Sequence, residues 1–495
     1  MSNSTVFAMH DIALVYRALP ALQGINWRVS EGQQWACLGP NGSGKTSLAR
    51  VLSGQAKHFS GELQRSQLLR NAGVAYVCFE EQKALCERDK KLDDSEFRRD
   101  ASDPGTTVRR AILGDQQASE AFHDWVARLN MAHILDRGLR FISTGEMRKT
   151  LLARAILSQP ALLILDSPLD GLDKASQEEL REIIDELLAS EQQVLLLCRQ
   201  IDDIPERVTH ILALDGGQVL GMGERDTLLA QADVIGLMRP PRVPFAALPP
   251  PLPRPYELPA AGPLLNLAGV CVSYGELSVL DKVNWRMERG QHWLVSGPNG
   301  CGKSTLLSLV TGDNHKAYGQ DITLFGLRRG SGESVWDIKQ KYGQVDTLLH
   351  LNWVRGMKVL EVVVSGFFDT VGLYDDWGDR QRATARGWLA ALGLADYERE
   401  SFDALSFGLQ RMVLLARAMA KSPLILLLDE PSLGLDGHHR QLLLDAIDHI
   451  ASNSDTQVIF VSHSAGEVPR CMTHHLAFSP SDDGYTVLSG ELKRQ

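Results

Sequence analysis

The stretch GPNGSGKTSL at residues 39–48 returns almost unchanged as GPNGCGKSTL at residues 297–306. Each copy fits the pattern GxxxxGK[ST], follows a short apolar run and precedes a segment of helical character. Glycines let a chain curl so that its amide hydrogens face a phosphate group, and the positive end of the following helix adds to the attraction. The repeat therefore predicts two phosphate-binding loops, each between a strand and a helix.

The side chains of these loops indicate a nucleotide and a divalent cation as ligands. In loops of this pattern the lysine reaches the β and γ phosphates, and the hydroxyl after it binds Mg²⁺. We therefore expect ATP and Mg²⁺ at both loops. The expected nucleotide-binding residues are Gly39, Asn41, Gly42, Gly44, Lys45, Thr46 and Ser47 in the first loop and Gly297, Asn299, Gly300, Gly302, Lys303, Ser304 and Thr305 in the second, with Thr46 and Ser304 as magnesium ligands.

The spacing of the loops indicates a duplicated domain. Lys45 and Lys303 stand 258 residues apart, too far for a solenoid repeat and right for a whole domain. Between the copies lies RPPRVPFAALPPPLPRPYELPAAGP, residues 239–263, and such a proline-rich stretch predicts an extended, semi-rigid spacer. The alternative is an internal loop of one domain. We predict domains at 1–238 and 265–495, joined by a linker at 239–264.

Composition limits the classes of function. The chain has 495 residues, a formal net charge of -10 and a pI near 5.8, which disfavours binding to nucleic acids. Seven cysteines without a CxxC pair suit a reducing cytoplasm and give no sign of zinc. The N-terminal residues do not resemble a signal peptide, and the apolar runs are shorter than the ~20 residues of a membrane-spanning helix. We therefore expect a cytoplasmic protein that reaches the inner membrane only peripherally, through a partner.

Acidic residues follow one buried strand of each copy. Short continuous apolar runs indicate strands buried on both faces, which predicts an α/β fold with mainly parallel sheets. In ALLILDSPLDGLD (161–173) and LILLLDEPSLGLD (424–436), Asp166 and Asp429 end such runs and are expected to bind Mg²⁺, because a buried carboxylate is costly without a cation. Glu430 is placed to act as a general base toward water. Ser167 stands at that position in the first copy and has no such basicity.

A third landmark is a serine and a glycine at a predicted helix start. Ser143 and Gly145 precede Asp166 in the same way as Ser406 and Gly408 precede Asp429, with 23 residues from serine to aspartate in both copies. A hydroxyl and open amides at a helix start can bind a phosphate. The alternative for each serine is an ordinary helix cap.

These elements resemble the Walker A, signature, Walker B and D-loop motifs of ATP-binding cassette (ABC) ATPases, over nearly the whole chain outside the linker. The resemblance implies two P-loop NTPase domains in tandem, each with a mainly parallel sheet, an antiparallel β subdomain and a helical subdomain. It also implies that Tyr16 and Tyr274 stack on adenine, the alternative being two core tyrosines. His463 matches the family's switch histidine and is expected to be catalytic with Glu430, whereas the first copy has Arg199 there.

The family's Q-loop glutamine is missing at its expected position. Aligning VAYVCF with YGQVDT places Phe79 and Thr347 there, with Gln82 and Gln344 three residues away. Because this loop couples a cassette to its membrane partner in transporters of the family, we expect either unusual coupling or an error in the alignment.

Since ABC domains pair head to tail, the resemblance implies that each nucleotide lies between the Walker motifs of one domain and the signature of the other. We expect the second site to hydrolyse ATP and the first, with Ser167 and Arg199, to hold it. LFGLRRGSGESVWDIKQ (324–340) and STGEMRKTLL (143–152) resemble members associated with molybdate transport. This favours an ATPase subunit that works with an integral-membrane transporter for molybdate or another small solute. The alternatives are a stand-alone ABC ATPase with a regulatory or translation-related role, or one in DNA repair.

Overall fold

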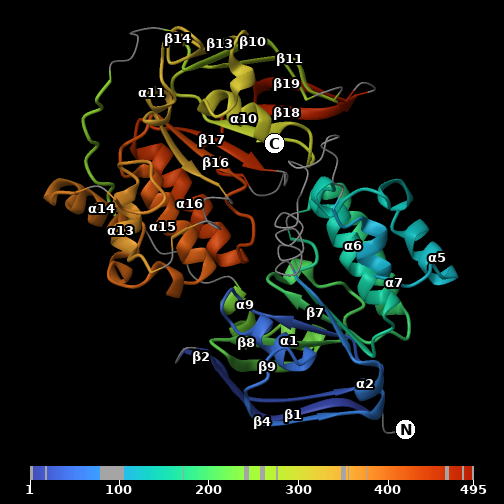
Figure 1. Ribbon diagram of the computed structural model, residues 1–495. Coiled ribbons are helices and arrows are strands. Elements are labelled where there is room, and N and C mark those ends of the chain that lie inside the picture. The colour runs from blue at the N-terminus through green and yellow to red at the C-terminus, as the bar shows by residue number, and fades with distance from the viewer. Residues whose placement is uncertain are drawn as a thin grey trace. The chain divides into compact units, whose positions relative to one another are not determined.

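The computed structural model describes residues 4–16, 19–78, 105–170, 172–238, 245–256, 262–274, 277–346, 353–354, 356–374, 376–462, 468–481 and 484–492. The chain divides into two compact units, which meet in the sequence between Pro241 and Arg242. Each unit repeats one plan, a six-stranded mainly parallel sheet beside a separate antiparallel sheet, with helices on both sides (Figure 1). The predicted α/β fold is confirmed.

The six-stranded sheet of the first unit has the order β5-β6-β7-β3-β8-β9, in which only β9 runs antiparallel to its neighbour. A separate antiparallel sheet has the order β2-β1-β4. The strands are β1 (Thr5–Tyr16), β2 (Leu19–Ser30), β3 (Trp35–Leu38), β4 (Ser60–Arg65), β5 (Val74–Val77), β6 (Leu162–Asp166), β7 (Val194–Cys198), β8 (His210–Asp215) and β9 (Gln218–Glu224). The helices are α1 (Lys45–Ser53), α2 (Gln67–Ala72), α4 (Val108–Leu113), α5 (Glu120–Arg128), α6 (Thr144–Leu157), α7 (Lys174–Ala189), α8 (Arg225–Leu229) and α9 (Ala232–Met238), with 3₁₀ turns at η2 (Ala132–Ile134), η3 (Leu139–Phe141) and η4 (Ile201–Asp203).

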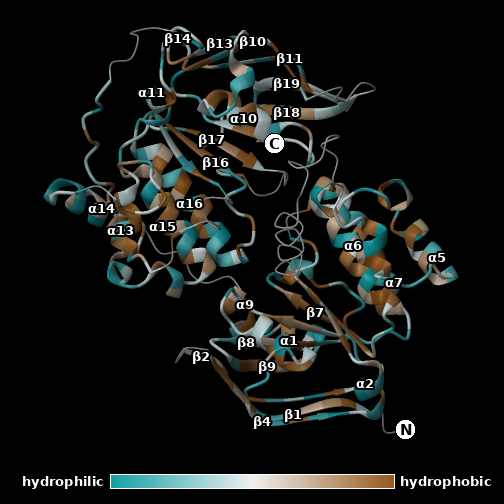
Figure 2. Ribbon diagram, viewed as in Figure 1, coloured by the Kyte–Doolittle hydropathy of each residue, from teal (hydrophilic) through white to brown (hydrophobic). Residues whose placement is uncertain are grey.

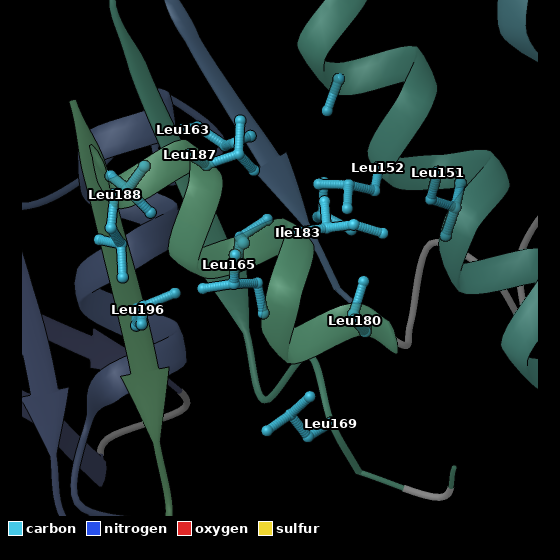
Figure 3. Packing of buried hydrophobic residues seen from close by; sticks show 14 of the residues in the cluster. Leu151, Leu152, Leu163, Leu165, Leu169, Leu180, Ile183, Leu187, Leu188 and Leu196 are labelled. Atoms are coloured by element: carbon cyan, nitrogen blue, oxygen red, sulfur yellow. The ribbon is translucent and has the colours of Figure 1, made fainter. Parts of the chain in front are cut away.

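Alternate residues of the inner strands point to opposite faces of this sheet, and an apolar core lies on each face. Leu163 and Leu165 of β6 face α6 and α7, where they pack with Ile183 and Leu187 (Figure 3). The intervening residues of β6 face α1 and the antiparallel sheet. Helix α7 buries leucine and isoleucine at helical spacing on one face only, and Figure 2 shows its polar residues on the other. The apolar run of β6 ends at Asp166, so this carboxylate stands at the carboxyl end of the strand.

The second unit has the same plan. Its six-stranded sheet has the order β15-β16-β17-β12-β18-β19, and its antiparallel sheet the order β11-β10-β13-β14. The strands are β10 (Leu265–Tyr274), β11 (Leu277–Met287), β12 (Trp293–Ser296), β13 (Asp321–Leu324), β14 (Leu327–Arg328), β15 (Tyr342–Val345), β16 (Ile425–Asp429), β17 (Gln457–Ser462), β18 (His474–Ser481) and β19 (Gly484–Glu491). The helices are α10 (Lys303–Thr311), α11 (Val335–Lys339), α13 (Val359–Ser365), α14 (Asp379–Ala391), α15 (Phe407–Met419) and α16 (Gly437–Asn453), with 3₁₀ turns at η5 (His315–Ala317), η6 (Ala395–Tyr397) and η7 (Phe402–Ala404).

Residues 245–256 of the proline-rich stretch form neither helix nor strand, as their composition predicts, but they lie against the second unit. We call this segment the strap. The backbone of Ala246 donates to the carbonyl of Ala391 at the end of α14 and accepts from His449 of α16 at 2.9 Å. Arg254 forms two hydrogen bonds with Asp455, at 2.6 and 2.8 Å. The strap thus joins two helices of the second unit rather than hanging free.

Within the described ranges, none of the helices combines the length and apolar character needed to cross a bilayer.

Candidate functional site

Both glycine loops lie where the sequence placed them, between a central parallel strand and a helix. The first connects β3 to α1 and the second connects β12 to α10, so the amides at each helix start face the loop. The last glycine of each loop, Gly44 and Gly302, has a φ near 100°. A side chain there would also crowd β2, since a Cβ at Gly44 would stand 2.8 Å from the carbonyl oxygen of Ala21.

The two loop lysines are buried and bound to their own loops. The Nζ atom of Lys45 donates to the carbonyls of Gly39 and Pro40 at 2.6 and 2.8 Å. Lys303 makes the same bonds to Gly297 and Pro298, at 2.8 and 2.7 Å. Burial lowers the pKa of Lys45 from its ordinary value. Each ammonium group thus hydrogen-bonds to its own loop, and an incoming phosphate would have to replace these backbone carbonyls as its partner.

Hydroxyl groups surround the acidic strand end of the first unit. The Oδ2 atom of Asp166 accepts from Thr46 at 3.0 Å and from the phenol of Tyr76 at 2.8 Å. Its Oδ1 atom accepts from Ser167 at 3.3 Å. Burial and the nearby carboxylate raise the pKa of Tyr76, so its hydroxyl stays protonated and remains a donor. Asp166 is therefore held by neutral donors.

The matching strand end of the second unit is acidic instead. Asp429 lies near Glu430 and Asp346, and burial together with these two charges raises its pKa to about 6, against a partial offset from Lys303. Such a carboxylate is stabilised by a bound cation. The two units therefore share backbone geometry here but differ in electrostatics.

Ser167 and Glu430 adopt the same unusual backbone conformation. Their φ angles are 48° and 46°, in the left-handed region that L-residues rarely occupy. In each case the amide donates to the end of the neighbouring strand, to Leu197 at 2.9 Å and to Val461 at 3.1 Å. This equivalence places the two side chains at one corresponding point beyond the strand, whatever their chemistry.

In the first unit, the residue at the position of the switch histidine takes part in an ion pair. Arg199, which follows β7, forms an ion pair with Asp170. Asp170 lies three residues after Ser167, and Arg148 of α6 binds the carbonyls of both, at 3.1 Å to Ser167 and 3.0 Å to Asp170. His463, the predicted switch residue of the second unit, lies outside the described residues.

The two signature serines act as helix caps. Ser143 caps α6, and its Oγ accepts from the amide of Glu146 at 3.2 Å while Glu146 accepts from the amide of Ser143 at 2.7 Å. Ser406 caps α15, where its Oγ accepts from the amide of Leu409 at 3.3 Å. A Cβ on Gly408 would lie 2.1 Å from the ring of His439, so glycine is required there by packing alone. The cap alternative accounts for these serines within each unit, and a phosphate role stays a prediction.

The two predicted adenine-stacking tyrosines are not core residues. Tyr16 ends β1 with 41% of its surface exposed, and Tyr274 ends β10 with 46% exposed. The hydroxyl of Tyr274 accepts from Asn314 at 3.0 Å. Exposure leaves both rings available for stacking on a base.

The remaining predictions fall on loops, on a strand or outside the described residues. Gln344 lies in β15, whereas Phe79, Gln82 and Thr347 are not described. The other predicted nucleotide-binding residues occupy the two glycine loops and the first turns of α1 and α10, namely Asn41, Gly42 and Ser47 in the first unit and Asn299, Gly300, Ser304 and Thr305 in the second.

Four further residues lie near these sites but were not predicted, namely Tyr76, Arg148, Asp170 and Asp346. Asp170 could have been found, as Arg199 was, by comparing the two copies, because an aspartate stands where the second copy has Leu433. The thiol of Cys301, in the second loop, is buried, and burial raises its pKa.

Comparison with known proteins matches the same regions. The family model described as ABC transporter matches residues 22–170 and 280–433. The chain is 39% identical over 462 residues to ABC transporter ATP-binding protein ModF of Escherichia coli, covering 92% of this chain and 93% of that protein. An uncharacterized ABC transporter ATP-binding protein of Schizosaccharomyces pombe is 26% identical, with the same coverage.

Among solved structures, a model of ribosome-bound archaeal Pelota and ABCE1 covers 98% of this chain and 78% of the matched chain, with a TM-score of 0.65. At 18% identity this likeness concerns the fold alone.

Proposed function

Because this chain belongs to the ABC transporter family and is an ATPase with two ATP-binding cassettes in tandem, we propose that its two nucleotide sites work unequally. Hydrolysis takes place chiefly at the second cassette, and the first binds ATP and holds it. The observation that carries this proposal is the contrast at the two acidic strand ends. Asp429 has Glu430 as its neighbour and a pKa raised to about 6, whereas Asp166 has Ser167 and is held by hydroxyl groups.

Magnesium would be held at these strand ends, and the residues fit such an ion. In the second cassette Asp429 and Ser304 would hold it, and the acidic surroundings of Asp429 favour a cation. In the first cassette Thr46 and Asp166 would hold it, and their hydroxyl and carboxylate already lie 3.0 Å apart. When bound, Mg²⁺ neutralises charge on the transferring phosphoryl group.

The side chains of the two sites would then take separate roles in nucleotide binding and hydrolysis. The ammonium groups of Lys45 and Lys303 exchange their loop carbonyls for β and γ phosphate oxygens. In the second site Glu430 orients the attacking water and accepts its proton, and His463 contacts the γ phosphate. In the first site Ser167 has no comparable basicity. The exposed rings of Tyr16 and Tyr274 would stack on the two adenines.

We further propose that the cassettes pair head to tail, with domain boundaries at residues 238 and 265. Ser406 and Gly408 would then complete the first site, and Ser143 and Gly145 the second. The equal serine-to-aspartate spacing in the two copies supports the assignment of both signature motifs. Each serine would keep its capping bond while the helix amides meet a phosphate.

The test compares matched variants of the full chain. Glu430→Gln should lower steady-state hydrolysis about 10²- to 10⁴-fold, the usual contribution of a general base, and leave ATP binding intact. Ser167→Ala, at the equivalent point of the first cassette, should keep most of the hydrolysis. Lys45→Ala should weaken retention of ATP with a smaller direct effect on turnover. Equal turnover from the two sites, measured in single-site variants, would refute the proposal.

For the biological role we propose that the cassettes energise an integral-membrane transporter for molybdate or another small solute, from the cytoplasmic side. Two relatives carry names of ABC transporter ATP-binding proteins, which supports this role. The alternative is a stand-alone ABC ATPase with a regulatory, translation-related or DNA-repair role. A pulldown from solubilised membranes, with and without ATP, distinguishes them, since recovery of no membrane protein under either condition favours the stand-alone role.

A further inference from the structure

The first cassette contains a charged pair at two positions where the second cassette has none. Asp170 corresponds to Leu433, and Arg199 corresponds to His463. Both replacements lie in one cassette, and in the fold they meet as an ion pair. The pairing follows from the sheet, because β6 and β7 are parallel neighbours and Asp166 stands opposite Leu197. Residues just beyond the two carboxyl ends are therefore adjacent.

This ion pair is largely shielded from water. The side chains of Arg199 and Asp170 are 23% and 18% exposed. An ion pair with this burial is screened less than a surface pair, and removing one partner leaves a charge that water only partly solvates. The guanidinium of Arg199 is therefore held by Asp170.

A second side chain, on α6, also holds residues 167–170. Arg148 is 5% exposed, and its two terminal nitrogens bind the carbonyls of Ser167 and Asp170. Residues 167–170 are thus fixed from one side by a helix that Ser143 caps and from the other by the end of β7. The corresponding arginine of the second cassette, Arg411, donates to the carbonyl of Asp346 at 3.0 Å.

We propose that Arg199 and Asp170 form a latch that holds residues 167–170 in one position whether or not a γ phosphate is present. Arg199 is then a positioning residue and not a phosphate ligand. The first cassette would keep its segment after the Walker B strand immobile, which suits a site that holds nucleotide. This inference builds on the proposed role of the first site, and its test separates the two.

The test uses the full chain with Lys303→Ala, which silences the second loop, and measures equilibrium binding of ATP and of ADP at the first. If Arg199 is a latch, Arg199→Ala changes both affinities by the same factor. If it is a phosphate ligand, ATP affinity falls about 10- to 100-fold relative to ADP, the range for a hydrogen bond to a charged group. A selective loss of ATP affinity overturns the latch.

Thermal unfolding of further variants of the full chain provides a second, independent test. Asp170→Leu and Arg199→His, the residues of the second cassette, should each lower the unfolding midpoint, because each leaves a shielded charge without its partner. The double variant should recover most of the loss. Additive losses in the double variant overturn the latch. If none of the proteins binds either nucleotide, the proposed role of the first site fails, and the unfolding arm still decides the latch.

Discussion

Replacing Asp429 with asparagine should stabilise the metal-free protein at neutral pH. The carboxyl has a pKa of about 6 in the folded chain against an ordinary value of 3.8, so the folded state binds its proton more tightly than the unfolded state. Stability is therefore lost as the pH rises from about 4 to about 6 and stays low above that range. A shift of about 2 pKa units corresponds to about 3 kcal/mol at pH 7.5 and to about half of that at pH 5. A neutral asparagine of the same shape removes this cost.

The assay is thermal unfolding of the full chain in a metal chelator without nucleotide, at pH 7.5 and pH 5. Asp429→Asn should raise the unfolding midpoint by about 6–12 °C at pH 7.5, from the usual 2–4 °C per kcal/mol, and by clearly less at pH 5. Asp166→Asn is the matched control, and it should not stabilise, because that carboxylate accepts three hydroxyl hydrogen bonds. An Asp429→Asn protein no more stable than the parent at pH 7.5, or equally stabilised at both pH values, refutes the reasoning.

Three further outcomes follow from individual contacts. Tyr76→Phe removes one hydrogen bond to Asp166 and should cost about 1 kcal/mol in unfolding free energy, measured by urea titration, with hydrolysis at the second site unchanged; a loss of turnover would contradict this. Arg254→Ala removes the paired bonds to Asp455 and should speed protease cleavage within residues 245–256, read by mass spectrometry, whereas an unchanged cleavage pattern would argue against a docked strap. Cys301 should react with iodoacetamide more slowly than exposed Cys271, measured by peptide mapping at pH 7.5, because its thiol is buried with a raised pKa; faster labelling would oppose that.

The sequence was informative where structure is determined locally. The glycine loops, the strands before them and the strand that ends in Asp166 were all predicted, because turn residues and continuous apolar runs specify them over fewer than a dozen positions. The exposure of Tyr16 and Tyr274 excludes the core alternative, and their stacking on adenine stays a prediction.

Contacts between distant segments could not be predicted in this way. Tyr76 lies 90 residues from Asp166, and its bond depends on the pairing of β5 with β6. The hydrogen bonds from Arg148 to the carbonyls of Ser167 and Asp170 likewise depend on how α6 packs against the sheet. Cross-strand and helix–sheet contacts of this kind follow from tertiary packing, which a single sequence does not display.

The strap has a practical consequence for anyone who truncates the chain. A fragment that starts at residue 265, where motif spacing suggests a boundary, would leave Phe245 and Leu248 behind, although both pack against the apolar core of the second unit. The bare surface would invite aggregation, and the carbonyl of Ala391 would lose its donor. A fragment that starts a few residues before Phe245 keeps this cover and is the better choice for producing the C-terminal cassette alone.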